Sequence, residues 1–372
     1  MPKFDTLDLR MMEGVGIYGP RNITKLARKL NMHPETLRGR LKRIRSQIFL
    51  YTNIYHTNLG LRKAVVHAQA VPGQEQLLFD CLKMNDFWIY VNRCYGINEG
   101  CLGIYTIPKD HAHEFEDFVL ELKKLKVTSD AKIFWPTCFQ AVHARCTWFD
   151  PNATKWIFPW EEWVNEIPTR TTQLPYTLID PKEFPVMADE IDVFVLKELE
   201  KNPSVSLTEV ATMLGISQQL AEYHYQKHIL ARWLLESFSI LDFRFDLKDS
   251  DMFFFFFTFD SLEKLARFAS SLLDKPFALG LGKVLGENTL IARIYLPKFE
   301  FRNFVDVLSK LIGMGLLQGY SYIIQDLRKA QRQTISYEYF KDRSWIYNHN
   351  KHIQNLKDLV NGAKFEQKAE LI

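Results

Sequence analysis

The sequence predicts an α+β protein that contains two copies of one unit, a winged helix-turn-helix followed by a sheet domain. Two short amphipathic helices joined by a tight turn occupy 22–45. Strand and helix patterns then follow in the order βαββαβ, which is typical of a ferredoxin-like antiparallel sheet covered by two helices. A shift of 184 residues aligns the first half with the second, so that Ala27 falls on Ala211 and Leu30 on Leu214. Such a repeat indicates an internal duplication.

The helix pair is predicted from apolar spacing and from its caps. The first helix covers 23–30 and the second 34–46. His33 stands at the N-cap position, and Pro34 at the first helical position, where a missing N–H costs nothing. A preceding helix is expected over 5–13 and a short β-wing over 48–59. The second helix buries Leu37, Leu41 and Ile44.

The elements after the wing follow from alternation and from breaks at Pro and Gly. Strands are expected over 62–70, 87–94, 101–107 and 131–138, and helices over 74–84 and 111–124. The expected domains are a DNA-binding winged helix-turn-helix (1–60), a βαββαβ domain (61–140), a Trp-rich strap and linker (141–188), an acidic helix-turn-helix (189–248), a second βαββαβ domain (249–327) and an extension (328–372).

Composition narrows the class of protein. The 372 residues are 47% hydrophobic and carry a formal net charge of only +3, so a polyanion would have to be bound by a local patch. The longest apolar run, 252–257, is far shorter than the ~20 residues of a membrane span. We therefore expect a cytoplasmic protein without a membrane partner, and one associated with the nucleoid if the local patch binds DNA. Five cysteines without a CxxC pair indicate free thiols in a reducing compartment.

The two helix-turn-helix segments differ in charge. Residues 1–50 contain 11 Lys and Arg against 4 Asp and Glu, which gives +7. Residues 189–236 contain 4 basic against 8 acidic residues, which gives −4. Since release of counterions from phosphates supplies much of DNA affinity, only the first segment is expected to bind DNA. We expect the second segment to pack against protein, although Gln218 and Gln219 leave adenine readout open.

The pattern IT-x-LA-x₂-L-x-M-x-P-x-TL-x-x-RL at 23–41 resembles the leucine-responsive regulator (Lrp/AsnC, feast/famine) family, here in a tandem-duplicated form. The resemblance implies a DNA-binding transcription regulator whose sheet (RAM) domains pair into dimers and bind effectors such as amino acids. It implies double-stranded DNA as the partner, and a homodimer or higher oligomer to read a two-fold operator. No cofactor, metal or catalytic residue is expected.

Candidate DNA-binding residues lie on the helix pair. Arg38 is our choice for guanine, with Glu35 and Thr36 near other base edges. Lys42 and Arg43 project away from the apolar stripe. For Arg40, which matches a recurrent Arg of the family, we expect a backbone contact or an internal ion pair. The remaining candidates, placed for phosphate at the start of the first helix, are Asn22, Thr24 and Lys25.

By the same resemblance, the turn after the second strand helps to hold an effector. It contains Gly96, Asn98, Glu99 and Gly100, but lacks the Asp of the family's Gly-x-x-Asp pattern. Cys94 and Cys101 flank the turn, either as a redox pair or as two buried thiols. The histidines at 67, 111, 113 and 143 show no metal spacing.

Three further alternatives remain open. The segment WFDPNATKWIFPWEEW is either an aromatic cofactor box or a packing strap, which we favour. The basic tail over 328–357 either embraces a partner subunit or adds phosphate contacts. Relatives with this fold, the sirohaem decarboxylases, combine two such units, so a tetrapyrrole enzyme is the alternative function; a protein-interaction scaffold is a third.

Overall fold

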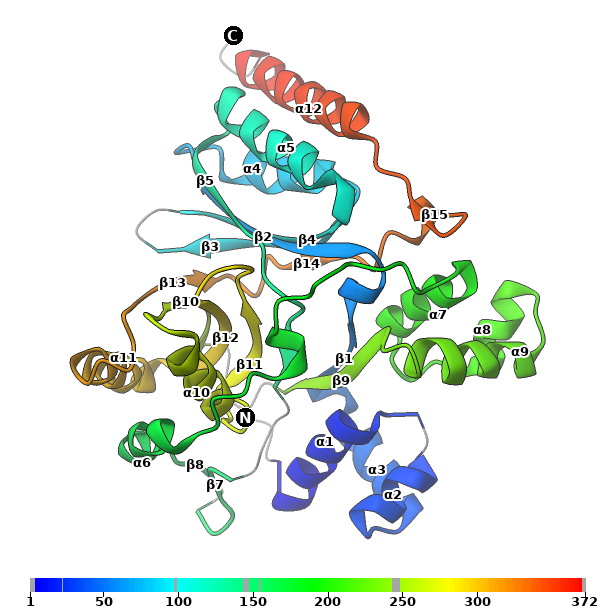
Figure 1. The fold of residues 1–372 in the computed structure, drawn as a ribbon, viewed down its shortest axis with the longest axis vertical. Helices are drawn as coiled ribbons and strands as arrows, with labels where there is room; N and C mark the ends of the chain where they lie inside the picture. Colours follow the sequence, from blue (N-terminus) through cyan, green and yellow to red (C-terminus); the bar gives the residue numbers. More distant parts are fainter. Residues whose placement is uncertain are drawn as a thin grey trace. The chain divides into compact units, whose positions relative to one another are not determined.

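A computed structural model of the protein describes residues 4–21, 23–96, 99–142, 147–153, 155–242 and 248–369 (Figure 1). The predicted α+β class is confirmed, and the strand pairs that are described are antiparallel. The chain divides into two compact units, each assembled from separated segments. Unit 1 contains Met1–Tyr55, Thr137–Asp180 and Glu198–Tyr322; unit 2 contains His56–Pro136, Pro181–Lys197 and Ile323–Ile372.

The N-terminal helix-turn-helix belongs to unit 1. It consists of α1 (Thr6–Tyr18), α2 (Ile23–Leu30) and α3 (Pro34–Ile44). The predicted bounds of α2 are confirmed, whereas α1 runs five residues beyond the expected end at 13. Its core is formed by apolar side chains of all three helices and of the following strand, chiefly Leu9, Met12, Val15, Leu26, Leu37, Ile44 and Ile48. This core fixes the orientation of α3.

The predicted β-wing is wrong. The strand after α3, β1 (Ile48–Ile54), pairs along its length with β9 (Leu235–Asp242), which follows the second helix-turn-helix. Asn53 lies opposite Ser237, its own equivalent under the 184-residue shift, and donates a 3.1 Å side-chain hydrogen bond to it. A lone hairpin is marginal in water, and pairing with the later copy satisfies the same backbone groups. The pair therefore has local two-fold symmetry.

Unit 2 contains the first sheet, with α4 and α5 on one face (Figure 1). The strand order β5-β2-β4-β3 is the ferredoxin-like order predicted from βαββαβ. Its elements are β2 (Leu61–Ala70), α4 (Glu75–Cys81), β3 (Trp88–Tyr95), β4 (Gly100–Pro108), α5 (Ala112–Lys124) and β5 (Thr128–Phe134). The edge strand β5 begins before the predicted 131, because its exposed polar residues Ser129 and Asp130 give no apolar alternation.

The second sheet has the order β13-β10-β12-β11. Its elements are β10 (Ser250–Thr258), α10 (Leu262–Leu272), β11 (Ala278–Lys283), β12 (Thr289–Pro297), α11 (Lys298–Gly313) and β13 (Gly319–Gln325). The five consecutive phenylalanines of β10 are buried on both faces. Among the residues that the structure describes, no helix combines the length and the apolar composition needed to cross a bilayer.

A short strand extends each sheet. The strand that extends the second sheet comes from the segment after the first sheet, and the strand that extends the first sheet comes from the segment after the second. In unit 1, β6 (Gln140–Ala141) pairs with β11, and in unit 2, β14 (Gln331–Arg332) pairs with β3. The Trp-rich segment continues with β7 (Phe149–Asp150), β8 (Lys155–Trp156) and α6 (Trp160–Glu166). Trp163 is fully buried against Phe277 and Phe304 and donates a 3.0 Å hydrogen bond to Ser271. The predicted packing strap is thus observed.

The C-terminal extension packs on its own chain within unit 2. Contact of the tail with a partner subunit or with phosphate stays a prediction. It forms β15 (Phe340–Lys341), β16 (Ser344–Trp345) and α12 (His349–Ala369), and α12 contacts α4 and α5 (Figure 1). Trp345 is buried, and its indole N–H donates a 2.6 Å hydrogen bond to the Leu59 carbonyl. Burial of the Trp345 ring stabilises the attachment of the extension to the first sheet domain.

Candidate nucleic-acid interface

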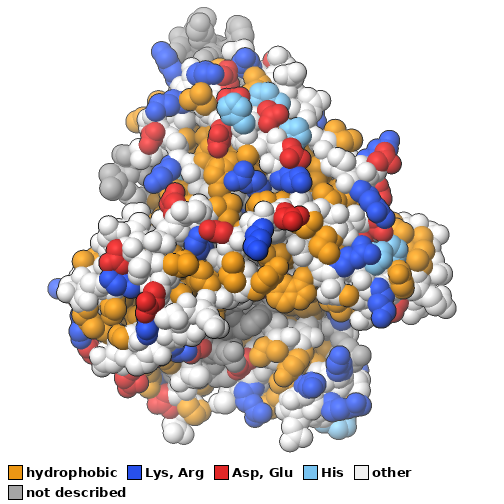
Figure 2. Space-filling model, viewed as in Figure 1, with side chains coloured by type: hydrophobic (Ala, Val, Ile, Leu, Met, Phe, Trp, Pro, Cys, Tyr) orange, Lys and Arg blue, Asp and Glu red, His pale blue; other side chains and the backbone are white. Residues whose placement is uncertain are grey.

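Helix α3 presents one apolar face to the core and its other faces to solvent. His33 caps it, as predicted: its Nδ1 accepts a hydrogen bond of 3.3 Å from the Glu35 N–H. Leu37 and Ile44 are buried, while Arg38, Lys42 and Arg45 are exposed. Figure 2 shows Lys and Arg side chains gathered over this helix-turn-helix. The sequence therefore builds a cationic rod of the size that enters a DNA groove.

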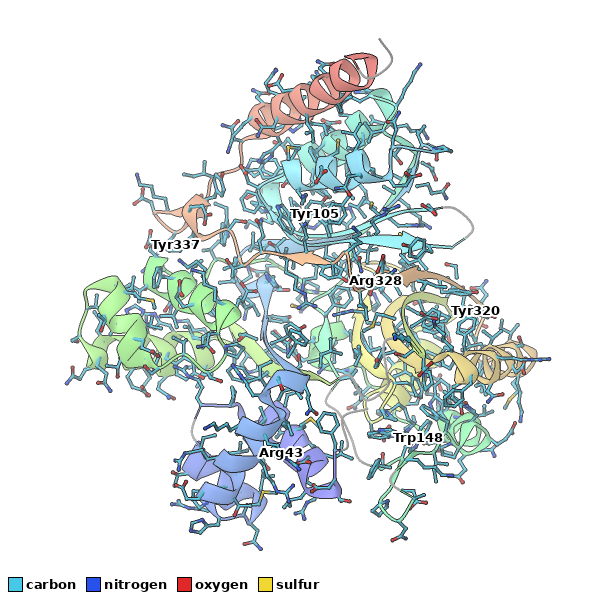
Figure 3. All side chains as sticks on the ribbon, turned by 180° about the vertical axis from the view of Figure 1, so that it is seen from behind. Arg43, Tyr105, Trp148, Tyr320, Arg328 and Tyr337 are labelled. Atoms are coloured by element: carbon cyan, nitrogen blue, oxygen red, sulfur yellow. The ribbon has the colours of Figure 1, made fainter. Side chains whose placement is uncertain are left out.

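Two of the predicted cations are held by carboxylates of α1. Arg40 Nη1 lies 2.8 Å from Asp5 Oδ2 and 2.8 Å from Asp8 Oδ1, and Arg43 forms an ion pair with Asp8 (Arg43 is labelled in Figure 3). Hydrogen bonds to Asp5 and Asp8 raise the pKa of Arg40. Burial is the largest single influence on Asp5 and raises its pKa, but the hydrogen bonds from Arg40 and from the Asp8 N–H, together with the charges of Arg40 and Arg43, outweigh burial, so the Asp5 pKa is lowered. Arg40 therefore takes the internal ion pair, the second of its two expected roles.

Asp8 belongs to this cluster, and sequence reasoning missed it. It is fully buried, and its carboxylate also closes a reciprocal capping box with Asp5 at the start of α1. A buried carboxylate is costly unless it is paired, and here Arg40 and Arg43 pair it. The signal was the Asp-x-x-Asp spacing at a helix start, which matches a capping box. Asp8 ties the orientation of α3 to α1.

Arg38 and Lys42 remain available to a ligand. The Arg38 side chain is 55% exposed, and among the described residues its one ion pair is with Glu35, itself 70% exposed. Such surface pairs contribute little stability, so phosphate or a base edge can replace the carboxylate. Lys42 is exposed, and no carboxylate of the described chain pairs with it. Thr24, Lys25 and Thr36 are exposed as well, whereas Asn22 lies outside the described residues.

The second helix pair, α8 (Leu207–Leu214) and α9 (Gln218–Tyr223), follows α7 (Glu190–Lys201). Ser217 caps α9, and a π-helical segment, His224–Leu230, continues it. Within the described chain, Ala221 of α9 is buried while Gln218, Gln219 and Glu222 are exposed, so packing of this face against another protein stays a prediction. The surface of α9 is accessible but lacks the cations of α3.

The predicted effector turn shows structural roles for its described residues. Glu99 lies 3.3 Å from Arg93 in an ion pair. Gly100 is buried at the start of β4, where a Cβ would stand 2.3 Å from the Ala68 carbonyl oxygen. Close packing of two strands therefore requires this glycine. Gly96 is exposed, and Asn98 lies outside the described residues.

The cysteines flanking that turn do not face each other across the hairpin. Cys94 lies opposite Gly100, and Cys101 lies opposite Arg93. Both thiols are free and buried, and burial raises the pKa of Cys101 to about 12. Because the thiolate is the reactive form, this environment disfavours the redox pair and fits the buried-thiol alternative. Cys146 and His143 lie outside the described residues.

Comparison with known proteins adds a fold likeness. No family model and no curated protein matches this sequence. The crystal structure of the siroheme decarboxylase NirDL aligns with a TM-score of 0.51 at 10% identity, covering 96% of this chain and 100% of that one. Its complex with an iron-uroporphyrin III analogue gives a TM-score of 0.51 at 11% identity, covering 96% and 98%.

Regulators of the Lrp/AsnC type align over about a third of the chain. LrpC of B.subtilis aligns at 16% identity with a TM-score of 0.28, covering 35% of this chain and 91% of its own. An AsnC family regulator from Agrobacterium tumefaciens aligns at 11% identity with a TM-score of 0.29, covering 36% and 89%. The comparisons thus show that the chain shares its fold, over nearly its whole length, with NirDL.

Proposed function

We propose that the protein is a sequence-specific, DNA-binding transcription regulator that reads duplex DNA with α3. The observation that carries the proposal is the solvent-exposed cationic face of α3, which carries Arg38 and Lys42 and is continued by Arg45 directly after the helix, while the opposite side of α3 is anchored in a core. A helix-turn-helix places its second helix in the major groove, where such side chains meet phosphates and base edges.

The residues divide into three roles. Arg38 gives a planar donor pair for guanine O6 and N7. Lys42, Arg45 and the exposed start of α2 contact phosphates, which set register and supply the salt-dependent affinity. Arg40, held by Asp5 and Asp8, positions α3 and leaves the groove to its neighbours. Arg43 also forms an ion pair with Asp8, but 54% of its side chain is exposed, so Arg43 can contact a phosphate while it keeps this pair.

The assembly follows from the duplication. Each chain offers one cationic recognition helix, so a two-fold operator requires two chains, that is, a homodimer or higher oligomer. The β1–β9 pair, with its local two-fold at Asn53 and Ser237, gives one chain the pairing that two copies of a single unit would make. A small-molecule effector remains part of the proposal.

The test is selection of bound duplexes from a random pool by the purified full chain, followed by titration at several salt concentrations. Arg38→Ala and Lys42→Ala are expected to weaken retention of the selected duplex, and loss of the Lys42 phosphate contact should lower the salt slope by about one. Lys227→Ala, an exposed cation after α9, is the matched control and should bind like the wild type.

Two outcomes would overturn the proposal. One is the absence of any enriched sequence from the pool together with salt-independent retention. The other is an unchanged affinity in both α3 variants when circular dichroism shows that they fold.

A tetrapyrrole enzyme is the second candidate, and its support is the full-length fold likeness to siroheme decarboxylase NirDL. Incubation of the purified chain with siroheme, followed by absorbance and by mass spectrometry for loss of carboxyl groups, tests it. Arg38 and Lys42 have no assigned role in binding or converting a tetrapyrrole. Their alanine variants should therefore keep the decarboxylase activity. A changed siroheme spectrum with no DNA selection would favour this candidate.

A further inference from the structure

Unit 2 contains a cavity of about 270 Å³ at the place where the C-terminal extension meets the first sheet domain. Figure 3 labels Arg328, which stands at this cavity. Side chains from α4, from β3 and from the segment before β14 line it together. The side chains that matter are Gln76, Phe79, Arg93, Arg328, Lys329 and Gln331.

The lining is cationic. It contains three basic side chains and no carboxylate. Arg93 lies 3.3 Å from Glu99, and the Arg328 Nε lies 3.1 Å from Asp326. Each of these two cations therefore has one carboxylate partner, and neither carboxylate lines the cavity. Lys329 has no ion pair within the described part of the chain. The cavity therefore carries at least one uncompensated positive charge.

The backbone around these cations is fixed. The Lys329 N–H donates a 3.0 Å hydrogen bond to the Asp326 carbonyl, which closes a turn, and Gln331 then pairs with Val91 of β3. Lys83, on the neighbouring turn, donates a 3.2 Å hydrogen bond to Gln331 Oε1. Asp326 is buried and also accepts a 3.1 Å hydrogen bond from the Tyr95 hydroxyl. The charges are thus presented by an anchored segment.

We propose that this cavity binds a small organic anion, a carboxylate or a phosphate ester joined to a flat apolar group and without an ammonium. Guanidinium and ammonium donors form strong charge-assisted hydrogen bonds with such anions. Phe79, a buried residue that also lines the cavity, offers an apolar surface to the rest of the ligand. The lining has no carboxylate for the ammonium of an amino acid. The volume lies just below the usual range for drug-sized ligands, so the ligand is small.

This site differs from the turn at Gly96–Gly100 and extends the proposed function without resting on it. The segment 326–332, where the C-terminal extension begins, supplies two of the three cations of the cavity, so a bound anion would strengthen the attachment of the extension to α4 and β3. Binding of a ligand to the folded state alone raises its stability. The ligand class can be tested with no DNA present.

The experiment is isothermal titration calorimetry of the purified full chain with phenyl phosphate, benzoate, inorganic phosphate and phenylalanine. Phenyl phosphate or benzoate is expected to bind at one site per chain. Binding of phenyl phosphate would identify the ligand as a phosphate ester, and binding of benzoate would identify it as a carboxylate. Phenylalanine, which adds an ammonium, and inorganic phosphate, which lacks the ring, are each expected to bind at least about tenfold more weakly.

The variants localise the site. Lys329→Ala should lower the affinity for the anion that binds by about tenfold or more, because one charge-assisted hydrogen bond is lost. Arg328→Ala should weaken it as well, although it also removes the ion pair with Asp326. Lys109→Ala, an exposed lysine of the same unit, is the control and should leave affinity unchanged. Absence of binding by both anions, equal binding of phenylalanine, or equal losses in Lys329→Ala and Lys109→Ala would overturn the proposal.

Discussion

The two helix-turn-helix pairs of this chain use the same backbone devices and expose different surfaces. Asn31 and Gly215, 184 residues apart, both adopt left-handed backbone, with φ of 53° and 66°, in the turn between the helices. The next helix is capped by His33 in one pair and by Ser217 in the other. Even the carboxylates before each pair repeat, since Asp189 and Asp192 exchange the same reciprocal hydrogen bonds as Asp5 and Asp8.

What differs is the charge on the outer face. Arg38 and Lys42 of the first pair correspond, under the 184-residue shift, to Glu222 and Gln226 of the second. Turn chemistry and a small apolar core are enough to build the motif, so they survive in both copies. Long-range attraction to phosphate depends on surface charge alone, and only the first copy has it. The comparison teaches that a motif can be kept while its surface charge changes within one chain.

The largest effect is expected on the free energy of unfolding, when a substitution breaks the ion-pair cluster of the first helix-turn-helix. Asp8→Ala removes the carboxylate that holds Arg40 and Arg43 and is expected to lower the free energy of unfolding by about 3–5 kcal/mol, because two cations lose their buried partner. Urea denaturation at pH 7 measures it. Ser206→Ala, which removes only the N-cap of α8, should cost about 1 kcal/mol. Equal losses in the two variants would show that the Asp8 cluster contributes nothing beyond a cap.

Grafting the missing cations sharpens the comparison. Glu222→Arg combined with Gln226→Lys should raise affinity for random duplex DNA about tenfold, and the salt slope should steepen by up to about 1.8, because two more phosphates can be neutralised. Fluorescence anisotropy at several salt concentrations measures both quantities. The pair Glu222→Gln and Gln226→Ala removes the acid without adding cations and serves as the control. If the graft binds no better than this control, the exposed face of α9 does not reach the duplex.

The turn residues should give smaller, opposite effects. Gly215→Ala is expected to destabilise the chain by roughly 1 kcal/mol, because a Cβ disfavours left-handed backbone, while the space around it is open. Asn31→Gly should stabilise the first turn by a few tenths of a kcal/mol for the same reason. Thermal denaturation of both variants measures the difference. A stabilising Gly215→Ala would show that the two turns do not share this backbone requirement.

The smallest effect is on acid titration. Asp5 has a lowered pKa, so its contribution to stability is present above its ordinary pKa and is lost as pH falls through the folded-state value. In Arg40→Gln, the carboxyl pKa of Asp5, followed by NMR, should rise. Hydrogen bonds from the Ser206 backbone and hydroxyl lower the pKa of Glu209, and this pKa should stay the same in that variant. A shift of both carboxyls would point to a general change in charge rather than to the Asp5–Arg40 pair.

Local patterns predicted most elements well. The apolar spacing of α2, the His33 cap and the order βαββαβ required only neighbouring residues, so the structure agrees with them. The wing failed because the partner of β1 is β9, nearly two hundred residues away, and no local pattern reports such a pairing. β5 was placed too late for a related reason, since its polar edge residues hide the strand.

The candidate site was predicted in composition but not in arrangement. The cationic character of α3 follows from residue types and helical spacing, and Arg38 and Lys42 are exposed as that spacing implies. The burial of Asp8 and the capture of Arg40 and Arg43 do not follow, because they depend on how α1 crosses α3. The cavity lined by Lys329 and Arg93 joins residues more than two hundred positions apart, and no motif marked it.

By itself, the sequence determined most of the helices and strands, the order in which they repeat, and the cationic character of the first copy alone. These properties reside in side-chain periodicity, capping and charge, which act over a few residues. The tertiary structure decided which strand pairs with β1, which arginines stay available to solvent, and which basic residues of the extension meet α4. Those outcomes depend on packing and on the pairing of buried polar groups between segments far apart in the chain, and that information is not local.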